Sequence, residues 1–250
     1  MEAVLSKLAN NSKADINGII VEKKDGYRIY QHVDGRDYCA LIIAFMRGEL
    51  NGQALPNDCP QRKVYLVEAY GQRFVLKIDG EVDTRPEKML WQFVFGPFYS
   101  RLMQKVNRIL DQGCDLIPRM YMVAEKVEYR ICRQAVVLLE YVEGTPWADV
   151  AEPEQWYDGV SRAIKKLHGL KLASNDVHPG NFIITANGMK IIDISCRGLM
   201  WVCRANDIIA LRKMYNIKIV PQGLGGKISL YLVKAQQRIH KLSRKLRGKK

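Results

Sequence analysis

The chain has few cysteines, and their spacing excludes the common cysteine-based architectures. The six contain no C-x-x-C pair and no dense framework; they are Cys39, Cys59, Cys114, Cys132, Cys196 and Cys203. This spacing argues against a zinc ribbon and against a disulfide scaffold. We therefore expect buried or idle thiols in a reducing cytosol.

The sequence also lacks a long apolar run. The stretch Ala40–Met46 is stopped by Arg47, well short of the ~20 residues that a spanning helix needs. The amino terminus has neither the charged start nor the apolar run of a signal peptide. We expect a cytoplasmic protein without a membrane-spanning helix.

Acidic residues are missing from the C-terminal part of the chain. After Asp207 there is no Asp or Glu, while this segment carries twelve of the 39 lysines and arginines. The net charge of +13 therefore belongs almost entirely to the C-terminal segment. Such local basicity predicts an anionic partner for this segment.

The first half of the chain reads as strands. Residues 18–68 form short strand-like runs, and the clearest pair follows as Val64–Glu68 and Arg73–Ile78 around a turn near Tyr70-Gly71. Alternation in the second strand places Lys77 away from its apolar face.

A helical region follows, then one buried strand, and then a further helix. A helical region runs from about residue 85 to 111, with a break at Gly96-Pro97. Gln134–Val142 reads as a buried strand that ends in a hinge, and Pro153 opens another helix. This order predicts an α+β, bilobal protein-kinase-like fold, with a β-rich N-lobe over 1–142 and a mainly helical C-lobe over 143–250.

The segment 174–195 combines a polar loop with a hairpin. Asn187-Gly188 between two β-rich runs predicts a two-residue turn, which places Phe182 opposite Asp193 and makes Asn181 a diagonal neighbour. An amide oxygen and a carboxylate then converge at the open end of the hairpin. Such oxygen ligands suit Mg²⁺, which completes its shell with water and phosphate oxygens.

Asp176 lies on the same loop as Asn181 and would face this metal site. It could accept the proton of a hydroxyl that attacks the γ-phosphate of ATP, a division of roles that protein kinases use. The pattern D-x4-N-x11-D, which ends at Asp193, therefore predicts phosphotransfer. The alternative is a polar loop that merely caps a hairpin.

The nucleotide contacts are expected in the first half of the chain. Lys77 is the candidate for the α- and β-phosphates, with Glu87 as its acidic partner and Glu81 as the competitor. Glu140 and Val142, at the end of the strand before the hinge, are further candidate nucleotide contacts.

Several other polar residues are expected to support the loop. His168 reads as structural, and His178 as a hydrogen-bonding support. Asp207 is expected to start a helix and cap it, and thereby also to brace the loop. Gly48–Gly52 is a candidate phosphate loop that could equally be an ordinary turn.

The short segment between Asp193 and Asp207 predicts the kind of molecule that accepts the phosphate. Only thirteen residues separate Asp193 from Asp207, and no A-P-E sequence follows. This leaves little room for the activation segment on which protein kinases lay a peptide. A small-molecule or glycan hydroxyl is the expected acceptor.

These residues resemble the lipopolysaccharide core heptose(II) kinase family, called RfaY or WaaY, from about Val64 to the C-terminus. The stretches that carry the resemblance are R-F-V-L-K-I, L-L-E-Y-V-E-G, S-N-D-V-H-P-G-N-F-I-I, K-I-I-D-I-S and the helix with Arg204 and Asp207. Asn175 stands where many relatives have glycine, and Ser195 where protein kinases have the glycine of D-F-G. Neither departure removes a ligand.

The resemblance implies transfer of the ATP γ-phosphate, with Mg²⁺, to a heptose hydroxyl of the lipopolysaccharide inner core. Asp176, Asn181, Asp193 and Lys77 match the family's motif positions and take its roles. The expected partner is the core glycolipid, and the expected location is the cytoplasmic face of a Gram-negative inner membrane.

The basic C-terminal segment fits this implication. An apolar stripe at helical spacing runs through it, with lysines and arginines around it: Leu232, Ala235, Ile239, Leu242 and Leu246. Such a helix could lie on an anionic membrane surface, or it could pack on the large lobe with solvated charges.

Two rival interpretations stay open at this point. A small atypical protein kinase, of the Rio or the tRNA-modification-complex type, would explain the basic tail by proximity to nucleic acid. A pseudokinase or basic binding module would have to explain why Asp176 and both metal ligands are intact. The heptose kinase interpretation expects no nucleic acid.

Overall fold

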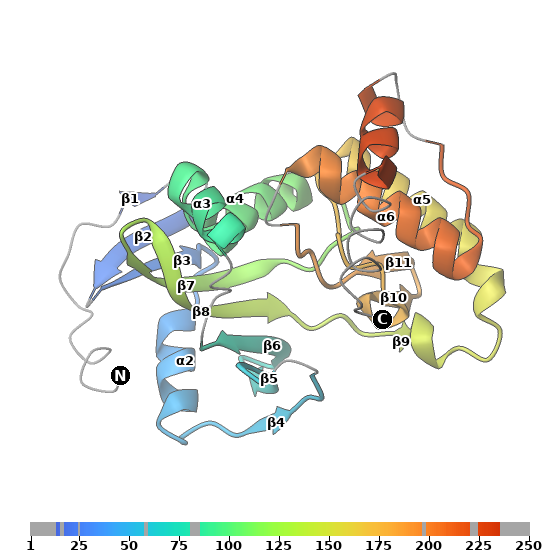
Figure 1. Cartoon of the computed structure of the whole chain (residues 1–250). Coiled ribbons are helices and arrows are strands. Elements are labelled where there is room, and N and C mark those ends of the chain that lie inside the picture. Colours follow the sequence, from blue (N-terminus) through green and yellow to red (C-terminus); the bar gives the residue numbers. More distant parts are fainter. Residues whose placement is uncertain are drawn as a thin grey trace. The chain divides into compact units, whose positions relative to one another are not determined.

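The structure is a computed structural model, which describes residues 14–15, 18–24, 26–57, 60–80, 86–196, 199–220 and 225–235. The chain divides into two compact units, Met1–Tyr141 and Val142–Lys250 (Figure 1). The first contains a large antiparallel sheet, and the second contains a small sheet and helices. The predicted α+β class is confirmed.

The first unit is built on an eight-stranded sheet in the order β1-β2-β3-β7-β8-β6-β5-β4. Each strand pairs antiparallel with its neighbours. The strands are β1 Ala14–Asp15, β2 Ile19–Lys24, β3 Tyr27–His32, β4 Gly52–Ala54, β5 Arg62–Ala69, β6 Gln72–Asp79, β7 Met120–Glu128 and β8 Ile131–Glu140.

The predicted hairpin that contains Lys77 is confirmed. Strands β5 and β6 pair from Arg62↔Asp79 to Ala69↔Gln72, which leaves Tyr70 and Gly71 as the turn. Both turn residues have positive φ, as a tight hairpin requires. Phe74 and Leu76 of β6 are fully buried.

A helix interrupts the region that the sequence pattern predicts as strands. Helix α2, Tyr38–Met46, contains the apolar run before Arg47, and the Asp37 side chain caps it by accepting the N–H of Ala40. Tyr38, Leu41 and Ile42 pack in one core with Phe74 and Leu76 and with β7 and β8. The short apolar run is ambiguous between strand and helix, and burial against this sheet face decides it.

Two helices cover the opposite face of β7 and β8, as Figure 1 shows. They are α3, Pro86–Phe95, and α4, Phe98–Asp111, so the predicted break at Gly96-Pro97 is confirmed. The buried Glu125 carboxylate accepts the N–H groups of Tyr99 and Ser100 in the first turn of α4. Glu125 thereby satisfies backbone donors that the helix itself leaves unpaired.

The candidate phosphate loop at Gly48 is an ordinary helix end. The N–H groups of Arg47, Gly48 and Glu49 donate to Ile43, Phe45 and Ala44 of α2. These amides close the helix, so they do not form an anion cradle.

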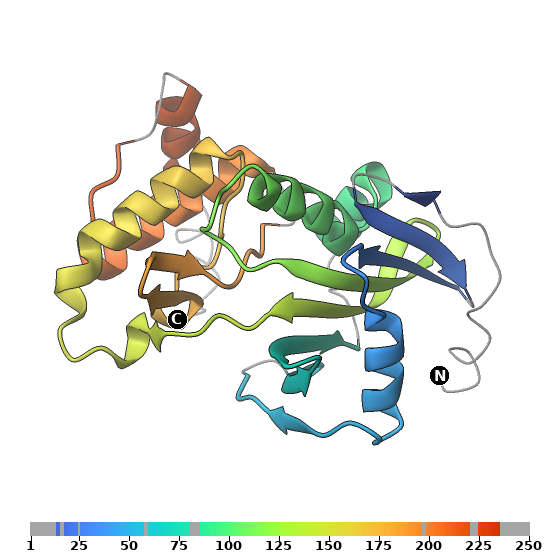
Figure 2. The ribbon, with the colours of Figure 1, turned by 180° about the vertical axis from the view of Figure 1, so that it is seen from behind.

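The second unit places two helices beside a small sheet (Figure 2). The sheet has the order β11-β10-β9. Its elements are β9 Thr145–Pro146, η1 Trp147–Asp149, η2 Pro153–Trp156, α5 Tyr157–Gly169, η3 Pro179–Asn181, β10 Phe182–Thr185, β11 Gly188–Ile191 and α6 Met200–Tyr215. Residues 225–235 form a further helix. In the described part of the chain, no helix is both long and apolar enough to cross a membrane.

Candidate active site

The polar loop begins on buried backbone after α5. Ser174 is fully buried, whereas Asn175 and Asp176 are exposed. Asn175 has φ of 60°, in the left-handed region that glycine and asparagine tolerate best. Asparagine at this position therefore suits the loop's conformation.

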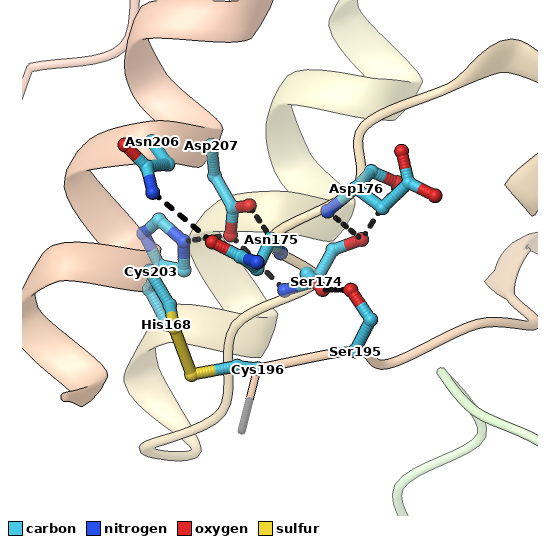
Figure 3. The surroundings of a disulfide bond; sticks show 9 residues. All are labelled: His168, Ser174, Asn175, Asp176, Ser195, Cys196, Cys203, Asn206 and Asp207. Atoms are coloured by element: carbon cyan, nitrogen blue, oxygen red, sulfur yellow. Dashed lines mark hydrogen bonds and ion pairs between the residues drawn. A yellow bond between two sulfur atoms is a disulfide. The ribbon is translucent and has the colours of Figure 1, made fainter. Parts of the chain in front are cut away.

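Asp207 holds this backbone from helix α6 (Figure 3). One of its carboxylate oxygens accepts the N–H of Asn175 at 2.6 Å, and the other accepts that of Ser174 at 3.1 Å. Asp207 lies in the middle of α6 and is fully buried. The predicted bracing role is confirmed, whereas the predicted start of a helix is wrong, because α6 begins at Met200.

His168 contacts Asp207, and its predicted structural role is confirmed. We call Asp207, His168 and Arg204 the brace of the loop. Its Nε2 lies 2.9 Å from the Asp207 carboxylate, and its backbone carbonyl accepts a hydrogen bond from Arg204. Burial lowers the pKa of Arg204, and the Asp207 charge partly offsets this effect. A histidine, an arginine and an aspartate from two helices thus fix one loop.

Ser174 connects the loop to the segment after the hairpin, a role that the sequence analysis missed. Its hydroxyl lies 3.0 Å from the carbonyl oxygen of Asp176 and 3.3 Å from that of Asp193. Its own carbonyl accepts both the N–H and the hydroxyl of Ser195, at 2.9 and 3.0 Å. The serine at 195, in place of glycine, therefore adds a bond to the loop.

The register of the predicted hairpin is wrong by two residues, because the turn lies one residue earlier in the chain. Thr185 pairs with Gly188, so the turn is Ala186-Asn187, and Phe182 lies opposite Ile191. The Thr185 hydroxyl accepts the N–H of Asn187 and donates to the carbonyl of Gly188. These two bonds close the turn one residue earlier than predicted.

The two candidate metal ligands nevertheless lie close along the backbone. The N–H of Ile192 donates to the carbonyl of Asn181 at 3.0 Å, and Asp193 is the next residue. The Asn181 side-chain nitrogen donates to the Asp176 carbonyl, which leaves the amide oxygen as its acceptor end. The loop thus brings Asp176, Asn181 and Asp193 together.

His178 supports the loop, as predicted. Its Nδ1 accepts the N–H of Gly180 and caps the short helix η3. Over the described ranges, no group of three or more His, Cys, Asp or Glu side chains could hold a metal. One carboxylate and one amide are the oxygen donors available here, a set that suits Mg²⁺ with phosphate and water.

The remaining candidates belong to the first unit or to its border. Lys77 lies on β6 opposite Val137 of β8, and Glu140 lies opposite Phe74. The Glu140 carboxylate accepts the N–H of Arg119 at 3.0 Å. Val142 is buried. Glu87 belongs to α3, but its side chain lies outside the described residues, as does the whole of Glu81.

Gly144 is required where the second unit begins. Its φ is 154°, and a Cβ at this position would overlap the carbonyl oxygen of Ile184 on β10. The glycine of the E-Y-V-E-G stretch therefore lets the chain lie against β10, where β9 pairs with Ile183 and Ile184.

The expectation that all cysteines are unpaired thiols is wrong for one pair. Cys196 and Cys203 form a disulfide, as Figure 3 shows. Both cysteines are buried with Ala173. Cys39, Cys114 and Cys132 do not take part in a disulfide. Spacing alone does not reveal the pair, because the fold brings the segment after Asp193 against the first turn of α6.

Comparisons with known proteins show the family of the chain. Residues 18–249 match the family model described as lipopolysaccharide core biosynthesis protein (WaaY). A lipopolysaccharide core heptose(II) kinase WaaY of Escherichia coli is 30% identical over 225 residues, which cover 90% of this chain and 96% of that protein. Its counterpart in Escherichia coli strain K12 is 24% identical over 222 residues, or 88% and 94% of the two chains.

Among solved structures, similarity extends to one titled WaaP in complex with acyl carrier protein. The two chains are 14% identical with a TM-score of 0.44, and the match covers 86% of this chain and 89% of the other.

Proposed function

Because this chain belongs to the WaaY family of lipopolysaccharide core biosynthesis proteins, we infer that it is an ATP-dependent kinase of a heptose in the lipopolysaccharide inner core. The observation that carries this proposal is the loop Ser174–Asn181, whose backbone is held by Asp207 and by Ser195. The two Escherichia coli relatives are named as heptose(II) kinases.

Asp176 is the proposed base. Its side chain is exposed, while its backbone is anchored by Ser174 and by the Asn181 side chain. A fixed backbone with an exposed carboxylate can meet an incoming hydroxyl and accept its proton. Burial raises the pKa of Tyr215 on α6, and the negative charge of Asp176 raises it further.

Asn181 and Asp193 are the proposed ligands of Mg²⁺. When bound with ATP, the ion would neutralise charge on the phosphate oxygens. Lys77 is the proposed partner of the α- and β-phosphates, with Glu87 as its acidic partner. Glu140 and Val142 are proposed nucleotide contacts, so residues 1–142 would form the nucleotide-binding lobe and 143–250 the catalytic lobe.

The acceptor proposed for this site is a sugar hydroxyl. The thirteen residues between Asp193 and Asp207 include the first turns of α6, and Ser195 and Cys196 are bound to the loop and to α6. The described residues of this segment, 194–196 and 199–206, offer no extended platform for a peptide. A hydroxyl on a compact glycan needs only access to Asp176.

We also propose that the chain contacts the inner membrane from its cytoplasmic face. Ile228, Tyr231 and Leu232 of the helix over 225–235 are 59%, 73% and 51% exposed, and Lys227 and Lys234 belong to the same helix. Exposed apolar side chains beside lysines favour an anionic lipid surface. Ile239, Leu242 and Leu246 of the predicted stripe lie outside the described residues.

The decisive experiment is mass spectrometry of lipopolysaccharide core from cells that carry the wild-type gene, no gene, or an Asp176→Ala gene. We expect one heptose phosphate to be lost without the gene and not restored by Asp176→Ala. Asp149→Ala, which changes another exposed aspartate of the same unit, should restore it.

A core that is unchanged by loss of the gene would overturn the proposal. Phosphate transfer by the purified chain to proteins, with none to core oligosaccharide, would favour the atypical protein kinase instead. Absence of any Mg²⁺-dependent ATP turnover would favour a pseudokinase.

A further inference from the structure

The Cys196–Cys203 disulfide lies between two supports of the catalytic loop. Cys196 follows Asp193 by three residues, and Cys203 precedes Asp207 by one helical turn. Both cysteines are less than 10% exposed, at 7% and 4%. The cross-link therefore joins the segment that carries a proposed metal ligand to the helix that carries the brace (Figure 3).

The hydrogen bonds on either side of the disulfide meet at one residue. Ser195, next to Cys196, donates twice to the carbonyl of Ser174, while Asp207 accepts the N–H of Ser174. Ser174, Ser195, the disulfide and Asp207 thus form a closed ring of bonds. Besides the six residues of chain between the two cysteines, the disulfide is the covalent link between the two arms of this ring. Opening it leaves that stretch of chain, hydrogen bonds and packing to hold the arms together.

We propose that Cys196 and Cys203 are a thiol–disulfide exchange site that sets the rigidity of the catalytic loop. The disulfide holds Ser195 and Asp207 on Ser174, and the dithiol form lets the two arms separate. Asp176 and Asn181 then lose their fixed backbone positions, and phosphotransfer slows. The effect on catalysis rests on the proposed kinase function, whereas the effect on the loop does not.

The exchange needs a low-molecular-weight disulfide such as oxidised glutathione. One cysteine thiolate attacks this disulfide, forms a mixed disulfide and releases one thiol. The second cysteine then attacks the mixed disulfide, forms the Cys196–Cys203 bond and releases the second thiol. Two electrons and two protons pass to the oxidant in total, and a small dithiol reverses both steps.

The position of Cys203 favours this chemistry. It lies in the first turn of α6, at the positive end of the helix dipole, which favours a thiolate. Leu199 and Trp201, which flank the start of the helix, are 38% and 40% exposed. A small disulfide therefore needs only local opening of this turn to reach the pair.

The first test measures the redox state of the full-length protein. We expect differential alkylation and mass spectrometry to show Cys196 and Cys203 joined in oxidised glutathione and separate in dithiothreitol, with a sharp midpoint between the two. Cys114 is a buried free thiol in the other unit. It should be alkylated after unfolding whether the protein was kept in oxidised glutathione or in dithiothreitol. A pair that remains as two thiols under oxidising conditions would overturn the proposal.

The second test compares both forms by hydrogen–deuterium exchange and by kinase assay. Reduction should speed exchange at Ser174, Asn175 and Ser195 and lower kcat at least about five-fold, the lower end of coupling between linked sites. The double variant Cys196→Ala/Cys203→Ala should have the exchange rates and kcat of the reduced protein, and adding reductant should change neither. In Cys114→Ala, the reductant should change both quantities as it does in wild type.

The outcomes separate the two proposals. Unchanged exchange on reduction, or a double variant that still responds to the reductant, would overturn the exchange site. Faster exchange without kinase activity in either form would support the exchange site and overturn the proposed function.

Discussion

The carboxylate of Asp207 lies 2.6 Å from the backbone nitrogen of Asn175, although the two residues are 32 positions apart in the chain. Asn175 is the residue before the proposed base, and its backbone is left-handed. A buried charge on α6 therefore determines the conformation of the loop at the point where it presents Asp176. This relationship motivates the first two predictions.

Asp207→Asn should destabilise the protein and slow the reaction. The amide keeps one acceptor oxygen but turns an N–H donor toward a backbone donor, so a buried hydrogen bond to a charged group is lost. We expect about 3 kcal/mol less unfolding free energy, in the range for such groups. Urea denaturation measures this loss.

The same variant should lower kcat on the order of 100-fold, because small displacements of catalytic groups are that costly. Asp149→Asn, at an exposed position, is the matched control and should change neither quantity. A kcat equal to wild type in Asp207→Asn would show that the brace does not position Asp176.

Substitutions at Asn175 should separate backbone strain from lost contacts. Asn175→Gly and Asn175→Ala both remove the side-chain bond to Asn206. Only alanine pays the cost of a left-handed backbone, about 1–2 kcal/mol. The urea midpoint of the alanine variant should therefore lie below that of the glycine variant, and equal midpoints would contradict the prediction.

Gly144→Ala should be strongly destabilising, because its Cβ would overlap the Ile184 carbonyl. We expect a loss of about 2 kcal/mol or more in unfolding free energy, as for an overpacked site. Gly169→Ala is the matched control, since a Cβ there meets nothing within 4 Å and the residue ends helix α5. The control should be neutral or slightly stabilising.

Glu125 should make stability depend on pH. Burial raises the pKa of its carboxyl in the folded protein, and the hydrogen bonds from Ser100 and Tyr99 offset only part of this effect. Between the unfolded and the folded pKa the folded state binds more protons, so stability falls as pH rises through that window.

Glu125→Gln keeps an oxygen to accept both N–H groups of α4 but removes the titrating proton. Its advantage over wild type in urea denaturation should therefore grow as pH rises from about 4.5. A difference between the two proteins that is constant with pH would contradict the raised pKa.

Local features of the chain are readable from its sequence. The break between α3 and α4 follows from the fixed φ of Pro97, and the β5–β6 hairpin follows from alternation around Tyr70-Gly71. The spacing of Asp176, Asn181 and Asp193 predicts phosphotransfer, because it matches the roles of base and metal ligands that we propose for these side chains.

Features that join distant segments needed the tertiary structure. Helix α2 forms where an ambiguous apolar run meets the face of β6 and β8, and the β10–β11 register depends on one hydroxyl, that of Thr185. Neither outcome follows from periodicity, because alternative pairings leave the same apolar residues buried.

The sequence by itself indicated the family and the type of reaction, since the residues of the predicted motif lie within one short segment and their chemistry suits phosphotransfer. The tertiary structure alone decided what holds that segment still: Asp207 in the middle of α6, the Ser174 hydroxyl between the carbonyls of Asp176 and Asp193, and the link from Cys196 to Cys203. Those contacts depend on how α6 packs against the loop, and a packing arrangement between distant segments leaves no pattern in a short window of sequence.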